Sequence, residues 1–292
     1  MKWHKRYPLV EHRSPSSGEG AARRAGVVAV LFLLFMPFSL PADDCDIRGT
    51  TDEAPALCGD AIQGGFLYGE SNWHVNDFGS GIFILPIGMD APDKLSVEFC
   101  KERGKNCQTF SYKVMQRKYS EQHITVAPKF VEWPKETADR IARENTQIRA
   151  SRDGRDMTMT GFLDFRHPLR GNWSTTSPYG ARRVFNGEPK NPHNGWDIGA
   201  PAGTDVHAIA DGRVVLTIDA YLPGKTVIID HGYGIFSIYI HLDKIKTKPG
   251  DKVSHDTVIG TVGNTGRSSG PHLHLGLYHN QVALDPELLF KD

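Results

Sequence analysis

The chain has 292 residues, enough for a removable leader and two compact domains of ordinary size. Hydrophobic residues make up 39% and charged residues 23%, which is typical of a folded globular protein and excludes a disordered chain and a bundle of membrane helices. The 34 basic and 34 acidic residues cancel, and no basic surplus or patch follows the leader, so we expect no nucleic acid partner.

Residues 1–42 have the layout of a secretory signal peptide. Basic residues end at Arg24, an apolar run follows over residues 27–38, and the small residue Ala42 closes the segment. We expect cleavage after Ala42 and a periplasmic or secreted protein associated with the cell envelope. A membrane anchor retained over residues 25–42 is the alternative, since this uncharged stretch is near the lower limit of about 17 residues for a spanning helix.

All four cysteines follow the leader and lie in the first half of the exported chain. In an oxidising compartment they predict two disulfides, and their spacing favours Cys45 with Cys58 and Cys100 with Cys107, although the sequence also permits other pairings. A zinc site made of the four cysteines is a rival interpretation, but the sequence contains no CxxC pair.

Residues 43–132 are predicted to form a small β accessory domain. Short β-prone runs, such as residues 80–86 and 122–126, alternate there with clusters of Gly, Pro and Asn. From residue 134 to residue 150 the pattern changes to that of a helix, with Pro at the first helical position and early acids. We therefore expect a helix and linker over residues 133–156.

Residues 157–292 are predicted to form a mainly β domain. Short β-branched runs recur between Gly-rich turns, for example at residues 212–216, 225–229 and 235–240, and no amphipathic helix interrupts them. This pattern favours a compact antiparallel sheet over alternating strands and helices.

Two histidines close to the C-terminus occupy alternate positions of one predicted strand. His272 and His274 should project from the same face, while Leu273 and Leu275 face the core. Two adjacent imidazoles repel each other when both are protonated, and they fill an apolar core poorly. A shared cation resolves this conflict, because metal binding requires neutral imidazole.

Two further segments offer polar side chains of the same kind. Gly195 could let the backbone bend so that His193 and Asp197 converge, and both residue types bind zinc well. Taken alone, an ordinary surface loop explains this pair better. In the third segment Tyr239 and His241 should share one strand face, and the other face should carry Ile238, Ile240 and Leu242. A histidine of an edge strand without a functional role is again the simpler explanation in isolation.

Together and in this order, the three segments resemble the lysostaphin-like, or LytM-like, M23 family of zinc endopeptidases. The matching motifs are the HxxxD of His193 and Asp197, the Tyr-x-His-Leu of residues 239–242 and the Gly-Pro-His-Leu-His of residues 270–274. Shorter matching stretches lie at residues 203–206, 210–212, 230–232, 249–251 and 263–266. The resemblance implies a peptidase domain of LytM type, an antiparallel β-sheet fold, over residues 157–292.

The resemblance also implies the roles of individual residues. His193, Asp197 and His274 would hold one Zn²⁺ per chain, and His241 and His272 would be catalytic histidines that do not bind the metal. Three protein ligands leave a fourth position for water, which zinc acidifies to a pKa of about 7 for attack on a peptide carbonyl. His272 is the favoured general base and His241 the favoured partner of the developing oxyanion, although the two roles could be exchanged.

The implied function is hydrolysis of peptide cross-links in bacterial peptidoglycan, whose stem peptides are the expected partner. The signal peptide and residues 182–187 resemble envelope members from Gram-negative bacteria that cut D-Ala to meso-diaminopimelate bonds. Cleavage of polyglycine bridges and a non-catalytic, LytM-like regulator of other wall hydrolases are the alternatives. The presence of all five site positions favours an enzyme. A wall-binding module with a structural metal would need four ligands, whereas three are evident.

The segment before the peptidase domain loosely resembles the accessory module and linker helix of some exported family members. Two roles are open for it. It could position the enzyme on the wall, or it could regulate the same chain by covering the catalytic groove.

Overall fold

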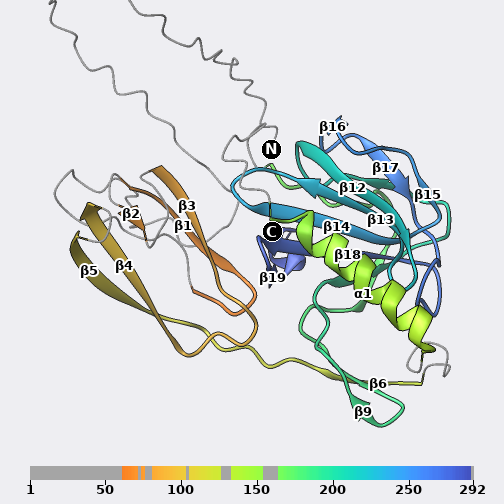
Figure 1. The fold of residues 1–292 in the computed structure, drawn as a ribbon, viewed down its shortest axis with the longest axis horizontal. Coiled ribbons are helices and arrows are strands. Elements are labelled where there is room, and N and C mark those ends of the chain that lie inside the picture. The colour runs from red at the N-terminus through yellow and green to blue at the C-terminus, as the bar shows by residue number, and fades with distance from the viewer. Residues whose placement is uncertain are drawn as a thin grey trace, which may run out of the picture. The chain divides into compact units, whose positions relative to one another are not determined.

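The computed structural model describes residues 61–71, 74–75, 81–102, 105–125, 133–153 and 164–290. The predicted signal peptide and the predicted pairing of Cys45 with Cys58 lie outside these residues. Within them, no helix has the length and apolar character that a membrane span requires. Among the described residues strands dominate and one α-helix accompanies them, so the predicted mainly β fold class is confirmed (Figure 1).

The described residues before the helix form two small antiparallel sheets. One joins β1 (Phe66–Ser71) to β3 (Gly81–Pro86), and the other contains β2 (His74–Val75), β4 (Lys94–Glu102) and β5 (Lys105–Lys113). Cys100 and Cys107 lie opposite each other on β4 and β5 and form the predicted disulfide. The two small sheets share an apolar core made of Ala61, Leu67, Leu85, Ile87, Val97, Phe99 and Val114.

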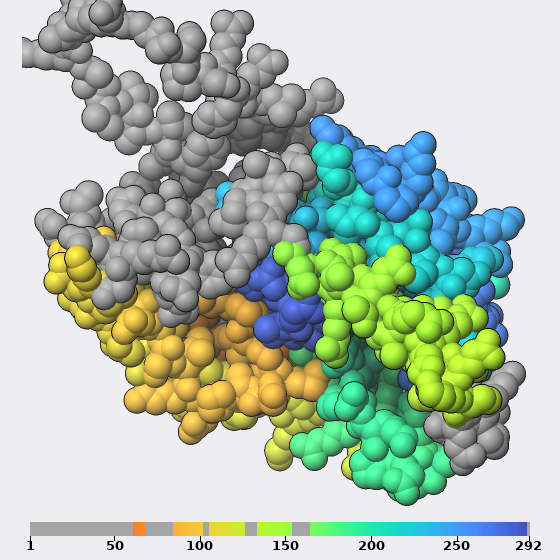
Figure 2. All heavy atoms as spheres, in the orientation of Figure 1, coloured from red at the N-terminus to blue at the C-terminus, as the bar shows by residue number. Residues whose placement is uncertain are grey.

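The predicted helix is present as α1 (Lys135–Ala150), with Pro134 at the N-cap position. Pro134 suits this place because the first turn of a helix does not need its missing N–H group. On the inner side Ile141 is buried, and Ile148 packs against an apolar cluster of the large C-terminal sheet described below. Figure 2 shows the exposed side of α1 lying along the surface beside the strands of that sheet.

The C-terminal region is built on a sheet of eight strands in the order β16-β12-β13-β14-β18-β10-β7, with β19 also paired to β18. All of these pairs are antiparallel. The strands are β7 (Ser174–Ser177), β10 (Trp196–Gly199), β12 (Gly212–Ala220), β13 (Gly224–Asp230), β14 (Ile235–Leu242), β16 (Lys252–Val253), β18 (His272–His279) and β19 (Val282–Leu284).

Two smaller sheets complete this region, and a 3-10 helix, Pro286–Phe290, follows the last strand. One sheet contains β11 (Asp205–His207), β17 (Val258–Thr261) and β15 (Lys244–Ile245). In the other, β6 (Glu121–Ile124) runs parallel to β8 (Arg182–Phe185), which pairs antiparallel with β9 (Glu188–Pro189). Residues before α1 therefore add a strand to a sheet that lies next to the predicted site.

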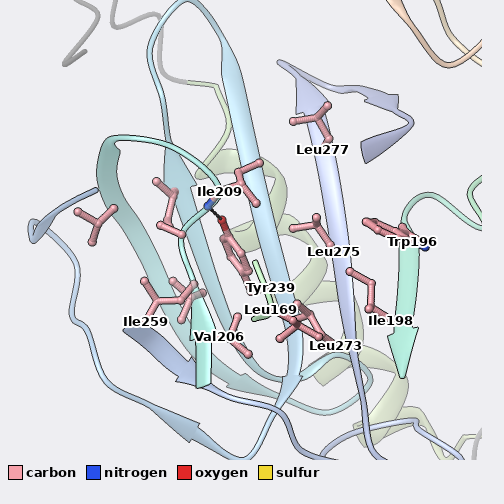
Figure 3. Packing of buried hydrophobic residues seen from close by; sticks show 14 of the residues in the cluster. Leu169, Trp196, Ile198, Val206, Ile209, Tyr239, Ile259, Leu273, Leu275 and Leu277 are labelled. Atoms are coloured by element: carbon pink, nitrogen blue, oxygen red, sulfur yellow. Dashed lines mark hydrogen bonds between the residues drawn. The ribbon is translucent and has the colours of Figure 1, made fainter. Parts of the chain in front are cut away.

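The two faces of the large sheet bury different clusters. Trp196, Ile198 and Tyr239 face the main core together with Leu273 and Leu275, as predicted for the two leucines (Figure 3). The other face carries a smaller apolar cluster of Leu216, Ile228, Phe236 and Ile238, against which the partly buried Ile240 also packs.

The predicted alternation along β14 is wrong at its C-terminal end. Leu242 should lie on the face of Ile238 and Ile240, but it packs in the main core with Tyr239. His241 should share the face of Tyr239, but its ring lies beside that of His272, on the side opposite the main core. The cause is local, because His241 adopts a positive φ of 64° and so interrupts the two-residue period of the strand.

Candidate functional site

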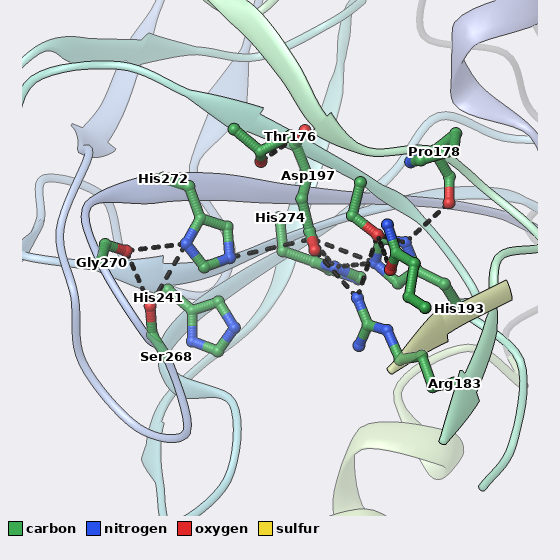
Figure 4. A network of polar contacts seen from close by, with 12 residues as sticks. Thr176, Pro178, Arg183, His193, Asp197, His241, Ser268, Gly270, His272 and His274 are labelled. Atoms are coloured by element: carbon green, nitrogen blue, oxygen red, sulfur yellow. Dashed lines mark hydrogen bonds and ion pairs between the residues drawn. The ribbon is translucent and has the colours of Figure 1, made fainter. Parts of the chain in front are cut away.

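The predicted ligand residues meet at one point on the face of the sheet opposite the main core (Figure 4). Asp197 on β10 is directly opposite His274 on β18 in the strand register. The Oδ1 atom of Asp197 lies 2.7 Å from Nδ1 of His274 and 3.0 Å from Nε2 of His193, and these two nitrogens are 2.9 Å apart. The structure thus brings together three side chains that the sequence places in two distant segments.

A backbone carbonyl group determines which nitrogen of His193 carries its proton. Nδ1 of His193 lies 2.9 Å from the carbonyl oxygen of Pro178, which can only accept a hydrogen bond. Nδ1 therefore donates, and Nε2 presents a lone pair to Asp197 and His274. This is the protonation state that a metal ligand requires.

The donor set fits a zinc ion. Two imidazole nitrogens and one carboxylate oxygen converge, and a single hydrogen on Nδ1 of His274 would have to serve both His193 and Asp197. A divalent cation would satisfy all three atoms at once, and three protein ligands of this kind are typical of catalytic zinc centres.

The surroundings keep these groups in the state that binds cations. Burial alone would raise the pKa of Asp197, but hydrogen bonds and charge from His193 and His274 outweigh it and hold that pKa well below its usual range. Burial lowers the pKa of His274 to about 4 against the opposing effect of Asp197. The carboxylate is therefore ionised and His274 neutral near pH 7.

Arg183 is part of the site, although the histidine motifs do not indicate it. Its Nη2 atom donates to Oδ2 of Asp197 at 2.9 Å, which leaves Oδ1 for the histidines. Arg183 lies on β8, whose strand partner β6 comes from the residues before α1. Only the spatial pairing of these strands makes this contact recognisable.

The two predicted catalytic histidines lie beside the ligand group. Nδ1 of His272 is 2.8 Å from the carbonyl oxygen of Gly270, and its Nε2 is 3.8 Å from Oδ1 of Asp197. Nδ1 of His241 is 2.8 Å from the carbonyl oxygen of Thr265, and the rings of His241 and His272 are 4.8 Å apart. By the same argument as for His193, the neutral ring of each carries its proton on Nδ1 and leaves a lone pair on Nε2.

His241 is strongly desolvated. Burial, followed by the charges of His274 and His272, lowers the pKa of His241 to about 3. Its neutral form is a proton acceptor at Nε2, and it can donate from that atom only after it has taken up a proton.

Gly195 matters for the space that it leaves. Its φ is not positive, so no special backbone conformation explains the glycine. A Cβ atom at this position would lie 2.6 Å from Nε2 of His274 and from the carbonyl oxygen of Leu275. The loop that carries His193 can therefore approach β18 only because residue 195 has no side chain.

The family model of peptidase family M23 matches residues 191–286, the segment that contains all five residues of this cluster. Residues 191–286 therefore have the sequence pattern of an M23 peptidase domain. The five positions lie on β10, β14 and β18 of this domain and in the loop that precedes β10.

Curated relatives are similar to a part of the chain. The peptidoglycan DD-endopeptidase ShyA of Vibrio cholerae is 42% identical over 113 residues, which are 38% of this chain and 26% of ShyA. The DD-carboxypeptidase/endopeptidase Mpg of Neisseria meningitidis is 38% identical over 111 residues, which are 38% of this chain and 26% of Mpg. The chain thus spans about a quarter of the length of these two relatives.

A crystal structure of an M23 protein from Pseudomonas aeruginosa is also similar. It shares 27% sequence identity with a TM-score of 0.61, and the likeness covers 79% of this chain and 95% of that one. The covered share is larger than the peptidase domain alone, so the likeness in fold extends to residues outside it.

Proposed function

We propose that this chain is a zinc-dependent endopeptidase that hydrolyses peptide cross-links of bacterial peptidoglycan. One observation carries the proposal: three converging ligand atoms lie beside two histidines that both present a proton-accepting nitrogen. The substrate class is supported by the match to the M23 family and by two relatives, one named a peptidoglycan DD-endopeptidase and the other a DD-carboxypeptidase/endopeptidase.

The proposed ligands are His193, Asp197 and His274. When bound, the metal ion supplies a water of lowered pKa and a Lewis acid for the scissile carbonyl. Pro178 and Arg183 hold His193 and Asp197 in place through the hydrogen bonds described above. Such outer partners keep ligands oriented and raise affinity for the metal.

His272 and His241 would move the protons of the reaction. His272 accepts the proton of the attacking water at Nε2, because Gly270 fixes its own proton on Nδ1. His241 starts as an acceptor for the same reason. Whichever imidazole gains the proton becomes a donor, first to the developing oxyanion and then to the leaving amine.

The bond that we propose joins D-Ala to meso-diaminopimelate, in keeping with the DD-endopeptidase names of the relatives.

We also propose that residues 1–42 direct export to the cell envelope and that residues 43–132 with the linker over 133–156 serve the peptidase domain as an accessory unit. A fragment that starts near Asp156 should hydrolyse wall material faster than the exported chain if the accessory unit covers the groove. Equal rates would exclude this regulation.

Digestion of purified peptidoglycan tests the proposed function. The full chain is incubated with walls cross-linked through diaminopimelate and with walls cross-linked through polyglycine, with His255→Ala as a matched control outside the site. We expect conversion of cross-linked dimers to monomers in the first material, with the new carboxyl end on D-Ala shown by mass. Cleavage in the second material alone would support the polyglycine rival, and zinc binding without any cleavage would support a regulator.

A further inference from the structure

Next to the ligand group lies a pocket of about 630 Å³, which we call the arginine pocket. Arg183, Arg267 and Lys190 line it together with Phe185, His193 and His274. None of the described residues that line this pocket is acidic. Two of the proposed metal ligands are thus part of the wall of a cationic cavity.

The two guanidinium groups face the same space for a structural reason. Arg183 and Phe185 are two residues apart on β8 and so project from the same face. The Cζ atom of Arg267 lies 5.2 Å from the centroid of the Phe185 ring, a cation–π contact that brings Arg267 to the side of Arg183.

Hydrogen bonds hold the loop that carries Arg267 next to the proposed catalytic histidines. Its backbone N–H donates to the carbonyl oxygen of Leu222 at 2.7 Å. Two residues earlier, the carbonyl oxygen of Thr265 accepts from Nδ1 of His241 at 2.8 Å, and Thr265 Oγ1 donates to the carbonyl oxygen of Leu242 at 2.8 Å. Arg267 is therefore placed by the same loop that orients His241.

Arg183 is already paired with the carboxylate of Asp197, which it contacts at 2.9 Å. The guanidinium group of Arg267 and the ammonium group of Lys190 are further positive groups that line the pocket. Burial, followed by the nearby charge of Arg183, lowers the pKa of Arg267. A zinc ion on His193, Asp197 and His274 would add further positive charge to this cavity. The electrostatics therefore favour a substrate with a carboxylate close to the scissile bond.

We propose that the arginine pocket binds the carboxylate on the carbon that bears the scissile amide nitrogen, with Arg267 as a specificity-determining residue. This inference rests on the proposed function. In a D-Ala to meso-diaminopimelate cross-link, that carbon carries a free carboxylate. In a polyglycine bridge, the corresponding carbonyl belongs to the next amide. The pocket would thus select one class of cross-link over the other.

Arg267 is a better test position than Arg183, because Arg183 also holds the proposed ligand Asp197. Two synthetic cross-linked peptide dimers are needed that differ only in this carboxylate, free in one and amidated in the other. The full chain is compared with Arg267→Met, Arg267→Lys and the control Arg213→Met, which changes an exposed arginine on β12 outside the pocket.

The unmodified chain should cleave the free carboxylate with a kcat/KM about 10- to 100-fold above that for the amide, the range expected for hydrogen bonds to a charged group. Arg267→Met should bring this ratio close to one, Arg267→Lys should retain part of it, and Arg213→Met should retain all of it. An unmodified chain that cleaves both dimers equally, or an Arg267→Met variant that keeps the preference, would overturn the proposal and leave the proposed function intact.

Calorimetry on the metal-free chain gives a readout that does not depend on hydrolysis. The probe is the diaminopimelate peptide that forms one product of cleavage, with its carboxylate free or amidated. We expect tighter binding of the free form and loss of this difference in Arg267→Met. If the full chain cleaves neither dimer, the proposed function fails, and equal binding of the two probes would separately refute the arginine pocket as a carboxylate site.

Discussion

The two oxygens of Asp197 have different partners. Oδ1 faces the histidines, and Oδ2 accepts from Arg183 on a strand of another sheet. A carboxylate held at one oxygen keeps the other in a fixed position, so the geometry of the proposed ligand Asp197 depends on a residue that is not itself a proposed ligand.

Replacement of Arg183 by Met should therefore weaken metal binding. We expect the affinity for zinc to fall about 10- to 100-fold, because Asp197 loses its orienting partner. Competition with a chelator measures the change. Arg182→Met is the matched control, since Arg182 is the exposed neighbour on β8. Equal affinities of the two variants would show that Arg183 does not support the centre.

A second histidine network lies away from the ligands. His231 is buried, its Nδ1 donates to the carbonyl oxygen of Asp211, and its Nε2 lies 2.7 Å from Oγ of Ser237. Ser237 Oγ is in turn 3.0 Å from the hydroxyl oxygen of Tyr239. A proton on Nε2 of His231 would have to be accommodated inside the core.

Stability should therefore fall in acid. Burial lowers the pKa of His231 from 6.5 to about 4. Between these values the unfolded chain binds a proton that the folded chain does not, so the free energy of unfolding decreases as the pH falls. At pH 5 the loss from this residue is about 2 kcal/mol at most.

Denaturant unfolding of the metal-free chain at pH 7.5 and pH 5 measures this effect, with His231→Gln beside the unmodified protein. The variant should show the smaller difference between the two pH values, even if its stability at pH 7.5 is lower. An unchanged pH dependence would assign the acid sensitivity to other groups.

At the scale of elements, the hairpin of β4 and β5 is closed by a covalent link. Cys100 and Cys107 are seven positions apart, and their disulfide removes freedom from the unfolded hairpin. The hairpin belongs to a different sheet from the ligand residues. Stability of the hairpin and metal binding should thus be separable.

The double variant Cys100→Ala with Cys107→Ala should lower the free energy of unfolding of the β4 and β5 region by about 2.5 kcal/mol, as loop closure of this length implies. Hydrogen exchange should localise the loss to these strands. Zinc affinity should not change. A fall in zinc affinity as large as the fall in stability would contradict the separation.

The sequence is informative where a local pattern repeats. The alternation of histidine and leucine along the predicted strand placed Leu273 and Leu275 in the core. The change from a strand pattern to a helical pattern over residues 134–150 predicted α1. Local pattern fails where one residue interrupts it, as the positive φ of His241 does on β14. It is also blind to partners distant in the chain, which is why the parallel pairing of β6 with β8 could not be foreseen.

The same limit applies to the site. The motif spacing drew attention to His193, Asp197 and His274, and the structure brings them together. Arg183 belongs to the stretch 182–187 that resembles Gram-negative envelope members, but nothing in that stretch indicates its contact with Asp197, which depends on where β8 lies in space. Residue types that bind metals can be recognised in sequence, whereas the residues that orient them cannot.

At the scale of the whole molecule, residues far apart in the chain are joined by polar contacts. Arg117 and Asp285 form an ion pair of 2.7 Å in which Asp285 is buried. Ser177 Oγ donates to Oε1 of Gln122 and lies 3.2 Å from Nδ1 of His193. The residues before α1 therefore contact the neighbourhood of the proposed metal centre directly.

Zinc should stabilise the fold as a whole, because the ligand group exists only when β10 and β18 are paired. At a free zinc concentration about 100 times its Kd, stability should rise by about 2.7 kcal/mol. Thermal unfolding with and without zinc measures this gain. His193→Ala should lose most of the gain, whereas His255→Ala should keep it. A gain of the same size in both variants would place the metal elsewhere.

We propose two separate roles in the site. His193, Asp197 and His274 hold the metal, and His272 and His241 move protons. Metal content and peptidoglycan hydrolysis, measured in parallel on the unmodified chain, His193→Ala and His272→Ala, test this assignment most directly. We expect His193→Ala to lose both properties, and His272→Ala to keep its zinc and to hydrolyse at least about 100-fold more slowly. Full hydrolysis by His272→Ala, or full metal content in His193→Ala, would contradict it.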